Sequence, residues 1–128
     1  MRLILDTHVF LWYVSADSRL PVAVKDAIQD PTNEVFLSAA SVWEAVIKNA
    51  IGKLPLPEPA ALYLPRQRLA HRITSLAIEE ESLAHLSSLP PLHRDPFDRV
   101  LVAQALHHGL TLVSLDAAVR AYAVPLLP

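Results

Sequence analysis

Short apolar runs alternate with longer stretches of helical spacing along the chain. The runs are followed by polar or turn-forming residues, which predicts buried strands at residues 2–5, 35–37, 73–76 and 110–115. The stretches between them predict helices at residues 7–15, 22–29, 41–51, 60–70, 79–86, 95–108 and 117–122. A last apolar segment, residues 124–127, is expected to form an edge strand.

Prolines and glycines mark several of the predicted boundaries. Pro21 is placed to open a helix, because a proline is well tolerated at the first helical position. Gly52 and Gly109 each follow a predicted helix, where a glycine commonly ends it. Three prolines within residues 54–59 fix φ and remove backbone donors, so this segment is predicted to be a loop.

Strands that alternate with helices predict parallel pairing through right-handed crossovers, and hence an α/β fold with a three-layer sandwich. The strand segments are nearly continuous apolar runs rather than alternating ones. This is typical of a parallel sheet that is covered on both faces. With 128 residues, the chain is expected to form a single domain over residues 1–128.

Composition narrows the possible functions. The formal net charge is −2, so nucleic-acid binding would need a local basic patch rather than an overall basic field. The chain has no cysteine, which excludes a disulfide scaffold, a thiol nucleophile and a thiolate zinc site. The apolar run before Asp6 is too short for a signal peptide, and no run reaches the roughly 18 residues of a membrane span. We therefore expect a soluble, cytoplasmic protein that does not enter a membrane.

Four acidic residues fall near the ends of the predicted strands. Asp6 and Asp116 come directly after the first and the last of the four strands. Glu44 lies one turn into the helix after the second strand. Asp98 lies in the first turn of the helix that leads into the last strand. Open parallel sheets bind ligands beyond the carboxyl ends of their strands. We therefore expect these four carboxylates to meet at one sheet edge.

Crowded carboxylates indicate a metal site. Their mutual repulsion is relieved by protonation or by a bound cation, and hard oxygen ligands select Mg²⁺ or Mn²⁺. Such an ion activates water, orients a phosphodiester and neutralises charge on the leaving oxygen, so no nucleophilic side chain is needed. The chain has only two glycines and therefore no glycine-rich phosphate loop, and it contains neither HExxH nor a serine elbow.

Each acid also has an ordinary structural explanation. Asp6 and Asp116 suit the N-caps of the helices that follow them. Glu44 completes a capping box that would begin at Ser41. Asp98 suits the positive end of a helix dipole. Capping explains each acid taken singly, whereas four acids at one sheet edge favour a shared metal site.

Four segments resemble the acidic blocks of PIN-domain proteins, and most closely those of VapC-type toxins of bacterial toxin–antitoxin pairs. In the family's order they are residues 4–12, 38–44, 93–105 and 112–116. The resemblance implies a Rossmann-like PIN fold with a parallel sheet of four to five strands flanked by helices. It also implies a Mg²⁺- or Mn²⁺-dependent endoribonuclease that acts on RNA, forms a homodimer and is inhibited by a cognate antitoxin protein.

The resemblance carries the family's four acids over to Asp6, Glu44, Asp98 and Asp116. Asp95 lies one turn before Asp98 and is either the helix cap or a further metal ligand. Thr7 and Ser114 resemble the small hydroxyl residues that hydrogen-bond the acids in this family. Leu115 is a departure, because many relatives have a hydroxyl residue directly before the last acid.

Basic residues and histidines complete the candidate set. Arg94 and Arg99 flank the third acid and are expected to contact substrate phosphates, because a guanidinium fork suits phosphate; solvated surface roles are the alternative. Lys48 lies four residues after the proposed glutamate ligand and is expected to pair with it along the helix. His107 and His108 are adjacent, so we expect them to point to different helix faces rather than to bind one metal ion.

Two other functions remain open at this point. A receiver-like domain also holds Mg²⁺ among acids, but it needs an acid pair after the first strand and a lysine near the last. Here Thr7 and His8 follow the single Asp6, and residues 123–128 contain no lysine. A PIN-like module that binds RNA or a partner without cutting is the other alternative. The presence of all four acids favours catalysis.

Overall fold

The computed structural model describes residues 1–91, 95–122 and 125–127. Within them, four parallel strands form one sheet in the order β3-β2-β1-β4, namely β1 (Arg2–Leu5), β2 (Glu34–Ser38), β3 (Thr74–Leu76) and β4 (Thr111–Val113). The central strand β1 pairs with two neighbours, so that Leu3 lies opposite Val35 of β2 and Thr111 of β4. The predicted α/β class with a four- to five-stranded parallel sheet is confirmed.

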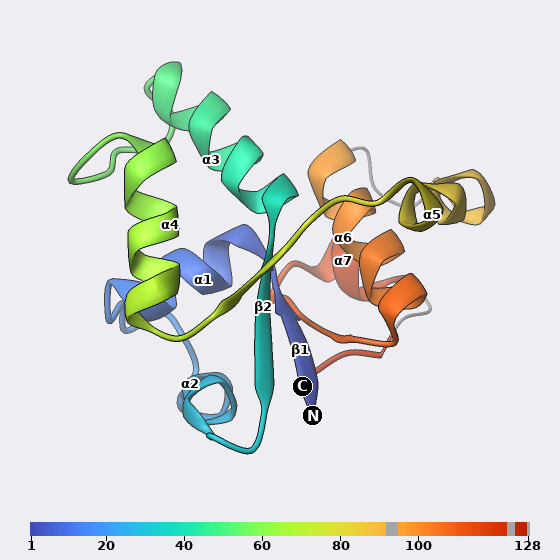
Figure 1. The fold of residues 1–128 in the computed structure, drawn as a ribbon, viewed down its shortest axis with the longest axis horizontal. Coiled ribbons are helices and arrows are strands. Elements are labelled where there is room, and N and C mark those ends of the chain that lie inside the picture. Colours follow the sequence, from blue (N-terminus) through green and yellow to red (C-terminus); the bar gives the residue numbers. More distant parts are fainter. Residues whose placement is uncertain (92–94, 123–124, 128) are drawn as a thin grey trace.

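Helices cover both faces of this sheet, as Figure 1 shows. They are α1 (Thr7–Val14), α2 (Val22–Gln29), α3 (Ala39–Ala50), α4 (Ala60–Ala70), α5 (Glu80–Leu83), the 3-10 helix η1 (Ala84–Ser88), α6 (Pro96–His108) and α7 (Ala117–Arg120). In the view of Figure 1, α1, α2 and α4 lie to the left of β1 and β2, and α5, α6 and α7 lie to the right. This is the three-layer arrangement that the alternation of strands and helices predicts.

Alternate residues of β1 feed two separate cores. Leu3 and Leu5 pack with Phe10 of α1 in the core on one face of the sheet. Ile4, between them, packs with Leu101 of α6 in the core on the other face. All five side chains are almost fully buried. Because successive side chains of a strand point to opposite faces, burial on both sides explains why this strand is apolar throughout.

The structure corrects three predicted boundaries. The helix predicted at residues 41–51 begins at Ala39, because Ser38 and not Ser41 is its N-cap: the Ser38 Oγ accepts the N–H of Ala40 at 3.0 Å. The strand predicted at residues 110–115 ends at Val113, opposite Leu5, because β1 offers no pairing partner beyond that point. The helix predicted at residues 79–86 is divided into α5 and η1.

Two features near the C-terminus complete the fold. The predicted edge strand at residues 124–127 begins outside the described residues, and within them Leu126 makes an isolated parallel bridge with Leu112. The helix predicted at residues 117–122 is the shorter α7. Of the described helices, none combines the length and the apolar character that crossing a membrane requires.

Candidate metal centre

The four predicted acids line one cavity of about 410 Å³ at the carboxyl ends of the strands. Asp6 follows β1 directly and begins α1, and Asp116 lies beyond the end of β4 and begins α7. Glu44 comes from the second turn of α3, which follows β2, and Asp98 comes from the first turn of α6. Figure 1 shows α1 and α3 starting at the same end of the sheet. The expected convergence is therefore present in the fold.

Asp6 is 6% exposed and is held by its own helix. Its Oδ1 caps α1 by accepting the N–H of Val9 at 2.8 Å. Burial raises the pKa of Asp6 above its ordinary value, and the nearby Glu44 carboxylate adds to the rise. Hydrogen bonds from Ser114 and Val9 and the charge of His8 act in the opposite direction but do not cancel it. A cation beside Asp6 would therefore stabilise its ionised form.

Glu44 is the most deeply buried acid of the cavity, at 2% exposure. The Thr7 hydroxyl donates to its Oε1 at 2.6 Å, and the Lys48 ammonium donates to its Oε2. The predicted capping box is wrong, because Ser38 caps α3 and Glu44 lies a turn further along. The Oγ of Ser41 is buried without a hydrogen-bond partner. Glu44 is therefore buried although it caps no helix.

Lys48 is the only lysine or arginine among the described residues that line the cavity. The predicted i,i+4 ion pair with Glu44 is confirmed. Burial by itself would lower the pKa of Lys48, but the hydrogen bond to Glu44 and the charges of Glu44, Asp95 and Asp98 outweigh it and raise the pKa. One ammonium group therefore faces five carboxylates, since Asp95 also lines the cavity. The cavity as a whole attracts cations.

Asp95 and Asp98 both line the cavity, but they differ in what else they do. Asp95 is the N-cap of α6, and its Oδ1 accepts the N–H groups of Phe97 at 2.9 Å and of Asp98 at 3.4 Å. Asp98 lies in the first turn of α6. Capping thus accounts for the position of Asp95, whose side chain also lines the cavity beside Asp98.

The hydroxyl residues lie where they can support the acids. Thr7 is bonded to Glu44, and Ser114 forms a side-chain hydrogen bond with Asp6. The Ser114 Oγ also accepts the N–H of Asp116 at 3.1 Å, and the Asp116 Oδ1 in turn caps α7 through the N–H of Ala118 at 2.8 Å. One serine therefore links the acids that follow β1 and β4.

The two predicted phosphate-binding arginines have different outcomes. Arg94 lies outside the described residues. Arg99 is not among the residues that line the cavity, and its guanidinium group donates instead to the Pro90 carbonyl at 3.1 Å, the Tyr122 hydroxyl at 3.1 Å and the Leu86 carbonyl at 3.3 Å. The reason is helical geometry, because Arg99 is turned by about 100° from its neighbour Asp98. Arg99 ties loops to α6 in this structure.

Besides the acids, the cavity lining includes His8, Trp12 and Lys48. His8 and Trp12 are four residues apart on α1 and make an edge contact, with ring centroids 6.4 Å apart. From the sequence, Lys48 is expected only as an ion-pair partner of Glu44. Helical spacing is the signal for its place in the cavity, because residues four apart, such as Glu44 and Lys48, lie on one face of a helix.

The sequence matches known proteins over almost its whole length. Residues 3–125 match the family model described as PIN domain. Ribonuclease VapC22 of Mycobacterium tuberculosis is 30% identical over 123 residues, which cover 95% of this chain and 92% of that protein. Ribonuclease VapC16 of the same organism is 41% identical over 58 residues, 45% of this chain and 41% of that protein.

Two solved complexes share the fold. VapBC2 from Rickettsia felis, bound to a DNA fragment from its promoter, aligns with a TM-score of 0.72 at 12% identity and covers 99% of this chain and 98% of that chain. VapBC-1 from nontypeable Haemophilus influenzae aligns with a TM-score of 0.66 at 17% identity, and the alignment covers 99% of this chain and 97% of that chain. At such identities the likeness concerns the fold alone.

Proposed function

The chain belongs to the PIN-domain family, and we propose that it is a Mg²⁺- or Mn²⁺-dependent endoribonuclease, the toxin of a toxin–antitoxin pair. The observation that carries this proposal is the cavity in which carboxylates from four separate segments meet one lysine. The relative that matches nearly the whole chain is itself named a ribonuclease. The receiver-like alternative has no support in the family match.

The donor set fits a hard divalent cation. We propose that the ligands are Asp6, Glu44, Asp98 and Asp116, since carboxylate oxygens are what Mg²⁺ and Mn²⁺ prefer. A divalent ion held there supplies Lewis acidity, which activates water and neutralises charge on the phosphodiester. The raised pKa of Asp6 and the burial of Glu44 support this assignment, because both carboxylates gain more from a nearby cation than exposed ones would.

The chain's own groups hold the acids in place. Thr7 fixes one oxygen of Glu44, and Ser114 bonds to Asp6 while it accepts the backbone N–H of Asp116. Such outer hydrogen bonds orient metal ligands and typically change metal affinity by about 10- to 100-fold when removed. Thr7 and Ser114 are therefore proposed as positioning residues that do not touch the substrate.

Asp95 and Asp98 are proposed to divide the work between capping and binding. Asp95 already accepts two backbone N–H groups of α6 through Oδ1. Asp98 lies in the first turn of the same helix and lines the cavity, and the charges of both acids act on Lys48. We therefore assign Asp98 as a ligand and Asp95 as the cap that orients the helix start.

RNA is the proposed substrate, which makes the cytoplasm the expected place of action. The related structures support a protein partner, because they are described as VapBC assemblies. We extend this to a cognate antitoxin for the present chain and to a homodimer. Arg94 stays a proposed phosphate contact. Arg99 would become one only if the region around α6 rearranges on binding RNA, since it is engaged by Pro90, Leu86 and Tyr122 in this structure.

The test is RNA cleavage by the purified protein with Mn²⁺, with EDTA, and with single Asn variants. We expect cleavage with Mn²⁺, none with EDTA, and losses of at least about 100-fold for Asp6→Asn and Asp98→Asn because a ligand charge is lost. Products should carry a 5′-phosphate and a 3′-hydroxyl. Asp95→Asn keeps the cap and should lose less activity than Asp98→Asn.

Asp26→Asn is the matched control, because Asp26 is an exposed aspartate on α2, away from the cavity. Its activity should equal that of the unmodified chain. Undiminished cleavage in EDTA would reject metal dependence, and a 2′,3′-cyclic phosphate end would reject hydrolysis by activated water. Binding of RNA without cleavage in the presence of Mn²⁺ would support the alternative of a PIN-like module that does not cut RNA.

A further inference from the structure

A second group of metal-binding side chains lies at the opposite end of α6 from the acid cavity. Glu79 directly precedes α5, and His107 and His108 are the last two residues of α6. One ligand atom from each of the three lies within 4.8 Å of the others. His107 is nine residues beyond Asp98, or about 13 Å along the helix axis. The group is therefore separate from the proposed nuclease site.

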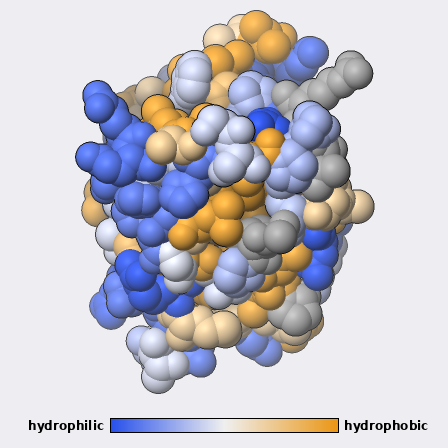
Figure 2. All heavy atoms as spheres, turned by 90° about the vertical axis from the view of Figure 1, so that its right-hand side faces the viewer, coloured by the Kyte–Doolittle hydropathy of each residue, from blue (hydrophilic) through white to orange (hydrophobic). Residues whose placement is uncertain are grey.

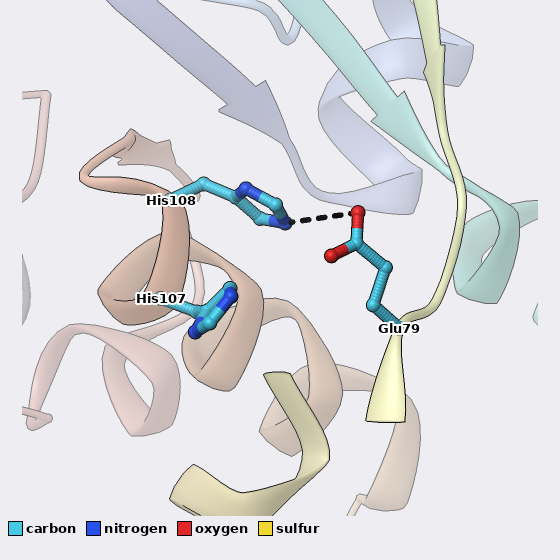
Figure 3. Close-up of side chains that lie close together, drawn as sticks. All are labelled: Glu79, His107 and His108. Carbon is cyan, nitrogen blue, oxygen red and sulfur yellow. Dashed lines mark ion pairs between the residues drawn. The ribbon is translucent and has the colours of Figure 1, made fainter. Parts of the chain in front are cut away.

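The two adjacent histidines converge, contrary to the expectation from their spacing. Their ring centroids are 4.9 Å apart with planes at 86°, and Figure 3 shows the His108 ring pointing toward the Glu79 carboxylate. Neighbouring helical positions differ by about 100° in direction, which an imidazole is long enough to bridge at a helix end. The two side chains therefore lie close enough to serve one metal ion, which their spacing in the sequence argues against.

The His108 Nε2 lacks a partner that its burial calls for. This atom is buried and has no hydrogen-bond partner in the described part of the chain. It lies 3.9 Å from the Glu79 Oε1, which is too far for a hydrogen bond. A tetrahedral zinc ion with bonds of about 2.0–2.2 Å separates nitrogen and oxygen by about 3.3–3.5 Å, so the two atoms would need to approach by about 0.5 Å to share one ion. A metal ion would therefore satisfy the nitrogen that the protein leaves unpaired.

His85 of η1 adds a further imidazole beside the three. Its Nε2 lies 3.4 Å from the His107 Nδ1. Two nitrogens on one tetrahedral zinc ion are separated by about 3.3 Å. The Glu79 side chain is 48% exposed, so an ion can enter from solvent. Figure 2 shows the face of the molecule on which α5 lies. Apolar atoms occupy the centre of this face, and hydrophilic atoms lie along one margin.

We propose that Glu79, His107 and His108 bind a divalent transition metal ion of the zinc type, supported by His85. Imidazole nitrogens favour Zn²⁺ over Mg²⁺, whereas the all-carboxylate cavity favours the reverse. The bound ion ties the segment before α5 to the end of α6. Because the ligands converge only in the folded chain, zinc should stabilise the fold.

The test is calorimetric titration of the full chain with zinc chloride, in an Asp98→Asn background that weakens the acid cavity. We expect one equivalent of zinc bound and a higher melting temperature with zinc than with magnesium. Adding His107→Gln or Glu79→Gln should weaken binding by more than about 100-fold, and His85→Gln by about 10- to 100-fold.

Matched controls separate this site from other acids and histidines. Glu80→Gln changes the exposed neighbour of Glu79, and His71→Gln changes a histidine outside the group; both should bind zinc as the background does. Equal zinc affinity in the background and in His107→Gln would overturn the proposal, as would the absence of any zinc binding. Circular dichroism of each apo variant verifies that a loss of binding is not a loss of folding.

Discussion

Replacing Thr7 by valine removes the hydroxyl that donates to the Glu44 Oε1 at 2.6 Å while almost keeping the size of the side chain. Both residues are β-branched, so the first turn of α1 should tolerate the change. Thr7 is 3% exposed and Glu44 is 2% exposed, so water has little access to replace the lost donor. The variant therefore leaves a buried carboxylate with one hydrogen bond fewer.

The size of the effect follows from this burial. A hydrogen bond to a charged group contributes about 1.5–3 kcal/mol, and an unreplaced one lies toward the upper part of that range. We expect the free energy of unfolding of Thr7→Val in EDTA to fall by about 2–3 kcal/mol. Thr7→Ser keeps the hydroxyl and should lose only about 0.8 kcal/mol for the missing methyl group.

Urea unfolding followed by tryptophan fluorescence measures both variants, and Mn²⁺ titration measures the consequence for the proposed site. If Thr7 orients Glu44 as a ligand, Mn²⁺ affinity should fall by about 10- to 100-fold in Thr7→Val and be nearly unchanged in Thr7→Ser. A Thr7→Val variant that is no less stable than Thr7→Ser would contradict a stabilising hydrogen bond from Thr7 to Glu44. Equal Mn²⁺ affinity of the two variants would contradict a role for Thr7 in orienting Glu44 as a metal ligand.

Three further outcomes are expected. Lys48→Met removes the cation beside Glu44, so urea unfolding in EDTA should show a loss of about 1–2 kcal/mol, and saturating Mn²⁺ should reduce that loss. Asp6 has a raised pKa, so its ionised form destabilises the metal-free fold at pH 7 and this penalty fades as the pH falls toward the ordinary value of 3.8. Asp6→Asn should then be more stable than the unmodified chain in EDTA at pH 7, by a margin that narrows toward pH 4; a constant margin would contradict the assignment. Gly109 ends α6 with φ of 64°, so Gly109→Ala should cost about 1 kcal/mol in thermal or urea unfolding, and Gly109→Asn less.

The structural and functional explanations of the acids are not exclusive. Asp6, Asp95 and Asp116 each cap a helix with Oδ1, as the sequence suggests, and each also lines the cavity. Glu44 shows the opposite pattern, because its predicted capping role is absent and its burial remains. Capping therefore weighs less against a metal role for Glu44 than the local sequence indicates.

The basic residues show where local patterns stop being informative. Arg99 is next to Asp98 in sequence, yet its guanidinium group bonds to Leu86, Pro90 and Tyr122. Lys48 is far from Asp98 in sequence, yet both line the cavity. Side-chain direction on a helix changes by about 100° per residue, so residues that are adjacent in sequence commonly face different surroundings.

The sequence by itself determined the order of strands and helices, the parallel sheet and the strand ends after which the acids lie. These follow from the local spacing of apolar residues and from turn-forming residues, which act over a few positions. Only the tertiary structure decided which side chains meet: Thr7 reaches Glu44 across 37 positions, and Glu79 reaches His108 from a separate segment. Such contacts depend on how distant helices pack against the sheet, which fixes side-chain directions that no local spacing encodes.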